Sequence, residues 1–271
     1  WGAFTRLREL EGDPALAAEP EGPDGSGGGP LRSTPPVLGE RLEIGSVVVR
    51  RERILLEMEH LVLPAGALVA VTGPNGAGKS TLVHALVGAI PAEVGLLRLD
   101  GRPLHRGELS RLFAWLPQEP TLWSGTVREN LAARGRSPRA IAEAVDAAGL
   151  APVLASLPEG LGSRLGVGGA PLSAGQKQRV ALARALADPA PILALDEPFS
   201  ALDEATAEDL EARLLALRGR RTMLVVTHRR SLLDRADHCV RLDRGRRAGG
   251  SDAIARGVLE GAAPHHGRGA L

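Results

Sequence analysis

Short apolar runs separated by polar, Pro or Gly turns begin at Leu42 and continue to about residue 116. Runs of this length, bounded by turn residues, predict β-strands. They are Val47–Val49, Ile54–Leu56, Leu61–Leu63, Ala67–Val71, Gly95–Leu99 and Phe113–Leu116. The dipeptide Asp100-Gly101, directly after the run Gly95–Leu99, is typical of two-residue hairpin turns. The pattern predicts an antiparallel β subdomain in this part of the chain.

Helical periodicity dominates from Thr126 onward. Between Thr126 and Ser156, Val127 and Leu131 are spaced by four, an Ala-rich segment follows, and a helix resumes after Leu172. Next come an apolar strand, a helix and another apolar strand, at Ile192–Leu195, about Glu204–Leu217 and Met223–Val226. This alternation predicts an α/β fold with a mainly parallel, doubly wound sheet. The helical segment over about 120–187 is predicted to be a subdomain inserted into that sheet.

The two ends of the chain lack this alternation. In residues 1–10, the spacing of Phe4, Leu7 and Leu10 predicts a short helix with these side chains near one face. Residues 11–39 are rich in Gly, Pro and Glu, a composition typical of flexible linkers. We therefore expect a helix remnant and linker over 1–39, the folded domain over 40–247 and a tail over 248–271. Because the chain begins with Trp1 and not Met, we expect it to come from a longer reading frame.

Composition narrows the kinds of partner. The 33 basic and 32 acidic residues leave a formal net charge of +1, which argues against a nucleic-acid partner, since general affinity for nucleic acids needs a strongly basic face. Cys239 is the only cysteine, which excludes an intramolecular disulfide and a Cys-based zinc site and fits a reducing compartment. No run approaches the roughly 18 consecutive apolar residues of a membrane helix.

A phosphate-binding loop lies between a predicted strand and a predicted helix. The strand ALVAVT leads into GPNGAGKST, which matches the Walker A pattern G-x-x-x-x-G-K-[ST]. Backbone N–H groups and the helix N-terminus bind the phosphates in such loops, Lys79 reaches the β- and γ-phosphates, and the Ser80 hydroxyl ligates Mg²⁺. A chance turn in a chain with 34 glycines lacks this strand and helix context. The predicted nucleotide-binding residues are Gly73, Pro74, Asn75, Gly76, Ala77, Gly78, Lys79, Ser80 and Thr81.

A pair of carboxylates follows the apolar strand that begins at Ile192. Because side chains alternate along a strand, Asp196 can face a Mg²⁺ ion while Glu197 polarises the attacking water. Alone, such a pair is more often an ordinary solvated strand end. Together with the phosphate loop, it indicates a Walker B site and chemistry on a Mg²⁺-bound nucleotide.

The segment between these two motifs resembles that of a known family. Leu172, Ser173, Ala174, Gly175 and Gln176, followed by KQRVALARAL, resemble the signature LSGGQ and the helix after it in ATP-binding cassette (ABC) ATPases. The resemblance spans roughly Leu42 to Arg246. It implies a P-loop NTPase fold, the cofactors ATP and Mg²⁺, and a signature that contacts the γ-phosphate of ATP. Ala174 replaces the usual glycine.

Three further positions match the family. Gln118 resembles the Q-loop glutamine, which the family uses to sense Mg²⁺ and to contact the transmembrane partner. Asp203, in the run from Ser200, resembles part of the D-loop at the dimer interface, and His228 resembles the H-loop histidine that contacts the γ-phosphate. In isolation each would be an ordinary loop or strand-end residue. Their order and spacing favour the functional interpretation.

Two positions depart from the family pattern. Arg50 lies where the family has an aromatic residue that stacks on adenine, so Arg50 or Arg51 stacks on the base instead or is an ordinary solvated arginine. Val167 lies where exporters have a glutamate, in the loop that helps to couple the ATPase to its membrane partner. The resemblance therefore leaves adenine stacking and coupling open.

The segment PQEPTLWSGTVRENL resembles that of ABC exporters, in which the membrane domain precedes the ATPase domain. This implies an exporter half at the cytoplasmic face of the cell membrane, with a transmembrane domain fused upstream and residues 4–10 ending its last membrane helix. A weaker resemblance links LPEGLGSRLG to bacterial thiol (cysteine or glutathione) exporter halves of cytochrome bd assembly.

The family mechanism implies a pair of ABC ATPase domains, homodimeric or heterodimeric, which closes head to tail around two Mg-ATP. Lys79, Glu197 and His228 are then the catalytic residues, and Ser80, Gln118 and Asp196 hold the metal. Two alternatives stay open: a regulatory cassette that does not hydrolyse ATP, and a stand-alone soluble ABC ATPase. A P-loop GTPase is excluded because it needs an N-K-x-D base reader, and Lys177, the only lysine besides Lys79, follows Gln176.

Overall fold

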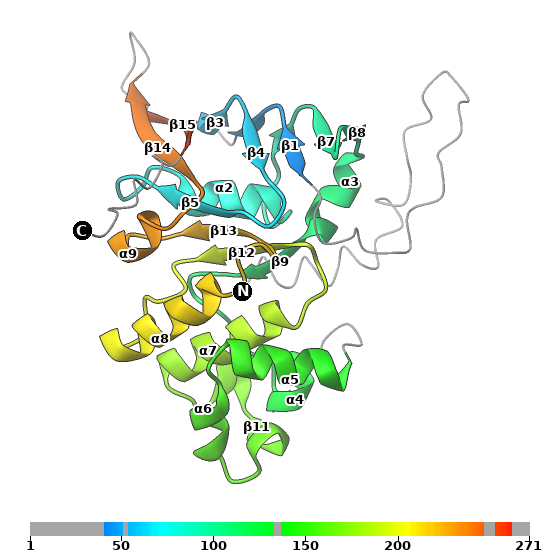
Figure 1. Cartoon of the computed structure of the whole chain (residues 1–271), viewed down its shortest axis with the longest axis vertical. Coiled ribbons are helices and arrows are strands. Elements are labelled where there is room, and N and C mark those ends of the chain that lie inside the picture. Colours follow the sequence, from blue (N-terminus) through cyan, green and yellow to red (C-terminus); the bar gives the residue numbers. More distant parts are fainter. Residues whose placement is uncertain (1–40, 51–53, 133–136, 247–252, 262–271) are drawn as a thin grey trace, which may run out of the picture. The chain divides into compact units, whose positions relative to one another are not determined.

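The computed structural model describes residues 41–50, 54–132, 137–246 and 253–261, and Figure 1 shows their arrangement. The predicted helix remnant and linker over 1–39 and position Arg51 lie outside these residues. Within the described ranges, every helix is too short or too polar to cross a lipid bilayer.

A nine-stranded sheet in the order β6-β2-β3-β15-β14-β5-β13-β12-β9 forms the centre of the described residues. Its strands are β2 (Val47–Arg50), β3 (Ile54–Met58), β5 (Leu68–Thr72), β6 (Glu93–Val94), β9 (Phe113–Leu116), β12 (Ile192–Asp196), β13 (Thr222–Val226), β14 (His238–Arg246) and β15 (Ala253–Gly261). The five consecutive strands from β14 to β9 pair in parallel, whereas β2, β6 and the β14–β15 hairpin pair antiparallel. The predicted α/β fold with a mainly parallel core is confirmed.

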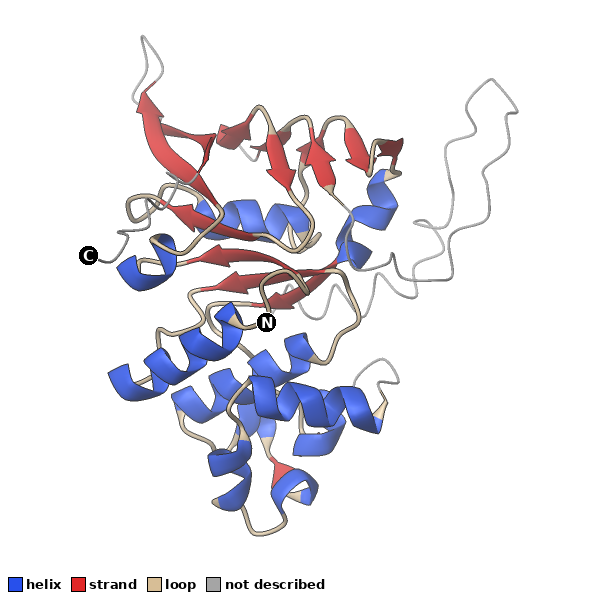
Figure 2. Ribbon diagram, viewed as in Figure 1, coloured by secondary structure: helices blue, strands red, loops and turns tan. Residues whose placement is uncertain are grey.

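The parallel strands are buried on both faces, as near-continuous apolar runs predict. In β12, Ile192 and Ala194 belong to the cluster around helix α2 (Lys79–Leu86), while Leu193 and Leu195 belong to the cluster around α7 (Ala174–Leu186) and α8 (Glu204–Leu215). Figure 2 shows α2 on one side of these strands and most other helices on the opposite side. The sheet therefore separates two hydrophobic cores, one on each of its faces.

A second, antiparallel sheet has the order β4-β1-β7-β8. Its strands are β1 (Leu42–Ile44), β4 (Leu61–Leu63), β7 (Leu97–Leu99) and β8 (Arg102–Pro103). Leu99 pairs with Arg102 across the turn, and both Asp100 and Gly101 have positive φ, as a type I′ hairpin requires. The predicted antiparallel sheet and its turn are confirmed, although the strand begins at Leu97.

Helices inserted between β9 and β12 form the lower part of Figure 1. They are α4 (Val127–Leu131), α5 (Pro138–Ala147), α6 (Ala151–Ala155) and α7, with the short paired strands β10 (Gly125–Thr126) and β11 (Arg164–Leu165) among them. Side-chain caps begin three of these helices: Thr126 accepts from the Glu129 amide, Ser137 from the Ala140 amide and Ser173 from the Gln176 amide. The helical insertion matches the sequence pattern.

The segment that we expected to be a C-terminal tail, 248–271, contains strand β15, which pairs with β14 and with β3. The sequence conceals this strand because Arg256, Gly257 and Glu260 interrupt its apolar residues, so no clean two-residue alternation is visible. The short helices α3 (Arg106–Leu109) and α9 (Arg230–Leu233) also had no sequence prediction, since four residues are too few for a helical period to show.

Candidate functional site

The predicted phosphate loop connects β5 directly to α2. Gly73, Gly76 and Gly78 all have positive φ, which residues with a side chain rarely adopt. At Gly73 a Cβ atom would lie 2.1 Å from the carbonyl oxygen of Leu242 in the neighbouring strand, so only glycine fits. The sequence thus folds into a tight backbone loop that ends at the N-terminus of a helix, the geometry that binds phosphate.

Lys79 is the first residue of α2 and only 8% of it is exposed. Its ammonium donates to the carbonyl oxygens of Gly73 (2.9 Å) and Pro74 (3.2 Å), so it lies across the loop. A compact positive charge at this point adds to the positive end of the helix dipole. Together they form an anion site.

Asp196 ends β12 and is completely buried. Neither of its carboxylate oxygens has a hydrogen-bond partner of good geometry, although the Ser80 hydroxyl lies close enough to favour the charged form. Burial raises the pKa of Asp196, against smaller opposing effects of Ser80, His84 and Lys79. A buried carboxylate without a partner is costly unless a cation joins it.

This donor set fits Mg²⁺. Magnesium prefers oxygen ligands and is usually held by one or two carboxylates together with substrate phosphates and water. Asp196 and Ser80 supply a carboxylate and a hydroxyl next to the phosphate loop. Among the described residues, no cluster of three or more His, Cys, Asp or Glu side chains forms an all-protein metal site.

Glu197 follows in a left-handed backbone conformation, with φ of 48°. Such a conformation costs a non-glycine residue about 1–3 kcal/mol and persists only where its surroundings impose it. The Glu197 amide donates to the Val226 carbonyl at 3.0 Å, and the Glu197 carbonyl accepts from the Ser200 amide at 3.2 Å. Glu197 thus leaves the strand conformation directly after Asp196, so the alternation rule used to predict its orientation does not apply to it.

The Glu197 carboxylate lies 3.3 Å from Nε2 of His228, which follows β13. Burial raises the pKa of Glu197, the nearby His228 lowers it, and the Asp196 charge raises it again. A raised pKa brings a carboxylate closer to neutral pH and makes it a better proton acceptor than an exposed glutamate. The structure thus brings two of the predicted catalytic residues into direct contact.

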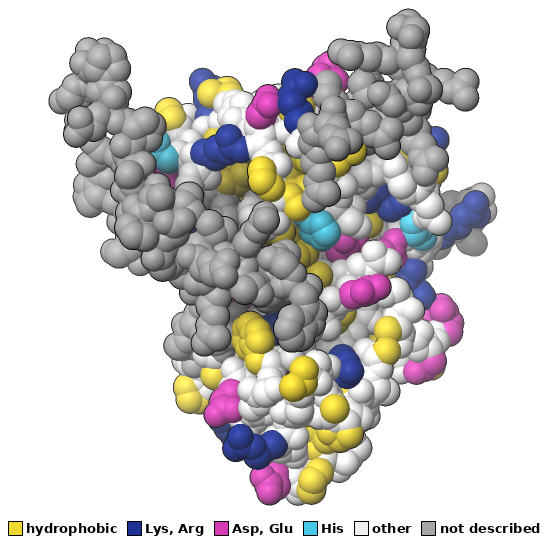
Figure 3. Space-filling model, turned by 180° about the vertical axis from the view of Figure 1, so that it is seen from behind, with side chains coloured by type: hydrophobic (Ala, Val, Ile, Leu, Met, Phe, Trp, Pro, Cys, Tyr) yellow, Lys and Arg dark blue, Asp and Glu magenta, His cyan; other side chains and the backbone are white. Residues whose placement is uncertain are grey.

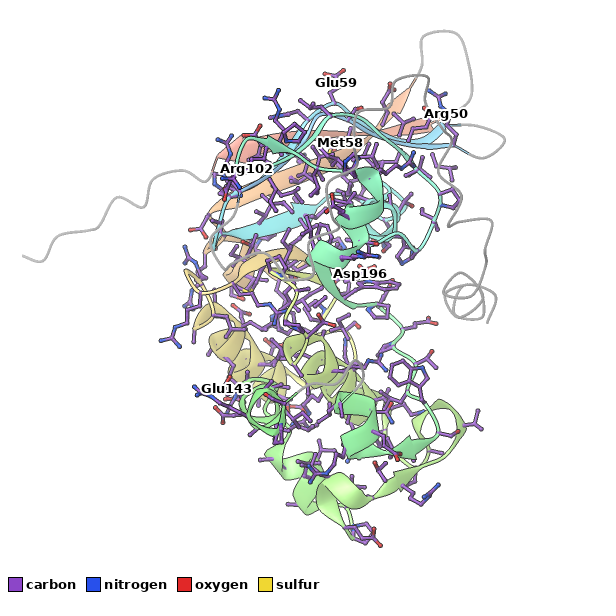
Figure 4. All side chains as sticks on the ribbon, turned by 90° about the vertical axis from the view of Figure 1, so that its right-hand side faces the viewer. Arg50, Met58, Glu59, Arg102, Glu143 and Asp196 are labelled. Atoms are coloured by element: carbon purple, nitrogen blue, oxygen red, sulfur yellow. The ribbon has the colours of Figure 1, made fainter. Side chains whose placement is uncertain are left out.

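The predicted residues gather at one edge of the sheet because parallel strands end at the same edge. In register, Leu195 of β12 pairs with Leu116 of β9, and Asp196 pairs with Val226 of β13. Gln118 follows β9 by two residues and is exposed there. In Figure 4, Asp196 lies between the strands above it and the inserted helices below.

The predicted signature residues surround the N-terminus of α7. The Ser173 hydroxyl accepts from the Gln176 amide (3.3 Å), and the Gln176 side chain accepts from the Ser173 amide (2.9 Å). Ser173 and Ala174 are exposed and Leu172 is buried beneath them. Ala174 therefore has no close neighbour that would require glycine, whereas a Cβ on Gly175 would lie 2.7 Å from the Ala201 carbonyl oxygen.

Three other predicted residues have local partners. Asp203 caps α8 by accepting from the amide and hydroxyl of Thr206, both at 2.9 Å, and these bonds lower its pKa. The Arg50 guanidinium pairs with the exposed Glu93 at 3.0 Å, and Figure 4 shows Arg50 apart from Asp196. Val167 is 80% exposed in a short turn before the signature.

Sequence reasoning missed two residues that hold the site in place. Gln178 of α7 is buried and hydrogen-bonds to the backbone of Glu197 and Ala201. Arg229, next to His228, binds Glu204 and Glu211 of α8 and lies over the Phe199 ring. In the sequence, Gln178 is marked only by being a polar residue among the apolar positions of a helix. Arg229 is marked only by its place next to His228.

The surface carries no broad charge of one sign on the side shown in Figure 3, where basic and acidic side chains of the described residues are interspersed. Anion binding at the loop therefore depends on local geometry, as the near-zero net charge indicated.

Known proteins share this sequence and fold. The chain is 41% identical over 202 residues to the ATP-dependent lipid A-core flippase of Cupriavidus pinatubonensis, covering 72% of this chain and 34% of the flippase. It is 37% identical over 201 residues to the type I secretion system ATP-binding protein PrsD of Rhizobium meliloti, again covering 72% and 34%. The chain thus spans about a third of the length of the curated relatives that it matches.

A solved structure of a bacterial Atm1-family ABC exporter with ATP bound superposes with a TM-score of 0.69 at 32% identity, over 80% of this chain and 40% of that one. The family model for ABC transporters matches residues 56–200, more than half of the chain and a range that includes the phosphate loop, the signature and the two carboxylates. The chain therefore belongs to the ABC transporter family, and the residues described above form an ATP-binding ATPase domain of that family.

Proposed function

We propose that this chain is the ATP-hydrolysing motor of an ABC exporter and works as a head-to-tail pair with a second ABC ATPase domain. One observation carries the proposal: the phosphate loop with Lys79, the buried Asp196 and the Glu197–His228 contact all meet at one sheet edge. Two relatives named for transport or secretion support the exporter assignment.

The residues of the site divide the work of hydrolysis between phosphate binding, activation of water and metal binding. The loop amides and Lys79 bind the β- and γ-phosphates and stabilise the charge that develops on them. Glu197 orients the attacking water and accepts its proton, and His228 holds the Glu197 carboxylate and contacts the γ-phosphate. Asp196, Ser80 and Gln118 would hold Mg²⁺, which supplies charge neutralisation on the phosphates.

The signature must come from a second domain. Ser173, Gly175 and the N-terminus of α7 present a hydroxyl, backbone amides and a positive helix end on an exposed surface. In the proposed pair this surface covers the γ-phosphate bound by the other domain. Arg50 stacks on the adenine in place of an aromatic residue once it exchanges its contact with Glu93 for the base.

The membrane partner is proposed from the size of the relatives. This chain spans about a third of their length, so a transmembrane domain accounts for the remainder, and the ATPase domain lies at the cytoplasmic face of the membrane. A membrane fraction prepared from cells that express the natural reading frame should retain the protein after a high-salt wash. Quantitative release by salt would refute fusion to a membrane domain.

Hydrolysis is tested by Glu197→Gln in the 271-residue chain. The variant should bind Mg-ATP, dimerise on a sizing column and lose hydrolysis by a factor on the order of 10² to 10⁴, the contribution of general-base catalysis. Glu204→Gln, on the exposed start of α8, is the matched control. A wild-type chain that binds Mg-ATP without turnover would instead establish the regulatory cassette, and turnover at the wild-type rate in Glu197→Gln would refute the role of Glu197.

A further inference from the structure

A buried glutamine connects the signature helix to the catalytic glutamate. Gln178 lies on the second turn of α7 and only 1% of it is exposed. Its amide nitrogen donates to the carbonyl oxygen of Glu197 at 3.0 Å and lies 3.4 Å from the Ser200 hydroxyl. Its amide oxygen accepts from the Ala201 backbone N–H at 3.0 Å. One side chain thus binds both ends of the segment 197–201.

A second contact holds the same two segments together. Gly175 packs so closely against the Ala201 carbonyl that an added Cβ would lie 2.7 Å from that oxygen. The start of α7 and the segment 197–201 therefore share contacts at two helix positions three residues apart. Because both contacts are to backbone atoms, neither segment can shift without moving the other.

The conformation of Glu197 explains why it needs such support. Its left-handed φ of 48° is unfavourable for a residue with a side chain, and its carbonyl points to the Gln178 amide. Without that donor, a buried carbonyl would lose one of its two hydrogen bonds, and the backbone that aims the carboxylate could relax. The direction of the catalytic carboxylate thus depends on a residue that never touches ATP.

We propose that Gln178 is a positioning residue that sets the orientation of Glu197 and links the two ATP sites of the pair. The proposal rests on the proposed function, in which Glu197 acts on the ATP bound by its own chain while α7 of the same chain covers the ATP of the partner. A shift of α7 when the partner's ATP binds is then passed through Gln178 to Glu197. Each site senses whether the other is occupied.

The chemistry of a side-chain amide suits this position. The amide group offers a donor to one backbone atom and an acceptor to another, whereas Lys and Arg only donate and ionised Glu only accepts. Met has a similar shape and makes neither bond. Gln178→Met therefore removes the link with little change in packing, and Gln178→Glu keeps the acceptor for Ala201 while placing a carboxylate against the Glu197 carbonyl.

The first test is the rate of ATP hydrolysis by the full 271-residue chain. Gln178→Met and Gln178→Glu should lower kcat about 10- to 100-fold, since a misplacement of about 1 Å can cost that much, and leave KM for ATP within about twofold. Val180→Ala, which removes buried atoms from the same helix, is the control. It should lower the melting temperature about as much as Gln178→Met does, but leave kcat within about twofold of the wild-type value. Equal losses of kcat in Val180→Ala and Gln178→Met would overturn the proposal.

A double-variant cycle separates positioning from general damage. In the Glu197→Gln background, Gln178→Met should cause no further loss of the residual hydrolysis, because its effect acts through the carboxylate. A further loss as large as in the wild-type background would refute action through Glu197. Absence of hydrolysis in the wild-type chain would instead refute the proposed function, and the positioning role with it.

The proposed link between the two ATP sites of the pair is tested by measuring the cooperativity of ATP hydrolysis. The wild-type chain should hydrolyse ATP with a Hill coefficient above 1, and Gln178→Met should bring it close to 1 at any residual rate. A wild-type coefficient of 1, or a raised coefficient that persists in Gln178→Met, would overturn the link.

Discussion

Arg229 joins the segment after β13 to helix α8, and its removal should destabilise the fold by a predictable amount. Its Nε donates to Glu211 at 3.0 Å, and its two terminal nitrogens donate to the two oxygens of Glu204 at 3.1 and 2.8 Å. The Glu211 side chain is only 6% exposed, whereas that of Glu204 is 72% exposed. Arg229→Met keeps an apolar side chain at this position and removes the charge, together with the guanidinium that lies over the Phe199 ring.

The buried partner determines the size of the effect. Removing one member of a buried ion pair costs about 3–5 kcal/mol, because the other charge stays buried without compensation. Glu211 keeps one hydrogen bond, from the Ser231 hydroxyl at 2.8 Å, which reduces the loss. We expect Arg229→Met to lower the free energy of unfolding by about 2–4 kcal/mol, most of it through Glu211. The exposed contact with Glu204 adds little because water solvates it.

Urea unfolding monitored by tryptophan fluorescence measures this difference. The double variant Arg229→Met, Glu211→Gln should recover more than half of the loss, because it removes the unpaired charge and keeps an acceptor for Ser231. Arg139→Met, which breaks an exposed pair with Glu143 on α5, is the matched control and should leave the urea midpoint unchanged. A loss below about 0.5 kcal/mol in Arg229→Met, or no recovery in the double variant, would refute the reasoning.

Three other variants test separate parts of the site. Burial raises the pKa of Asp196 above its ordinary 3.8, so the folded chain binds that proton more tightly than the unfolded chain and loses stability as pH rises through the raised value. Asp196→Asn should therefore raise the melting temperature at pH 7 but not below about pH 4, and a lower melting temperature at pH 7 would contradict this. Gly175→Ala should reduce ATPase activity about tenfold or more, because the new Cβ would displace Ala201. Gly107→Ala, whose Cβ would meet no neighbouring atom, is the control and should leave the activity unchanged. Equal activities of the two variants would show that the close approach of Gly175 to Ala201 is unimportant. Arg50→Ala should weaken ATP affinity about two- to fivefold in a calorimetric titration, and an unchanged affinity would eliminate the stacking role.

The sequence was sufficient for those parts of the site that depend on local pattern. The strand, loop and helix around Gly73 follow from a buried apolar run, positive-φ glycines and a helix start, all of which are contiguous. The strand end at Asp196 was also predictable, whereas the left-handed backbone of Glu197, just beyond the strand, was not, because alternation holds only within a strand. The hairpin turn at Asp100 followed from its dipeptide alone.

Contacts between distant segments were not predictable. The pair Arg50–Glu93 depends on the register of β2 with β6, which nothing in either short strand specifies. The Gln178 bonds join residues 19 and 23 positions away, and their existence depends on how α7 packs against the loop after β12. A polar residue at a buried helical position signals that a partner exists but does not identify it.

The helical insertion leaves the sheet after β9 and re-enters it at β12, and these two strands are hydrogen-bonded neighbours. Because these two strands run parallel, the insertion leaves at the carboxyl end of β9 and returns to the amino end of β12, so the core fixes its two ends at opposite ends of neighbouring strands whatever lies between them. The entropy of closing such a loop grows only slowly with its length. Evolution can therefore lengthen, shorten or reshape the helices between the two ends while the phosphate loop and the strands that carry Asp196 and precede His228 stay unchanged.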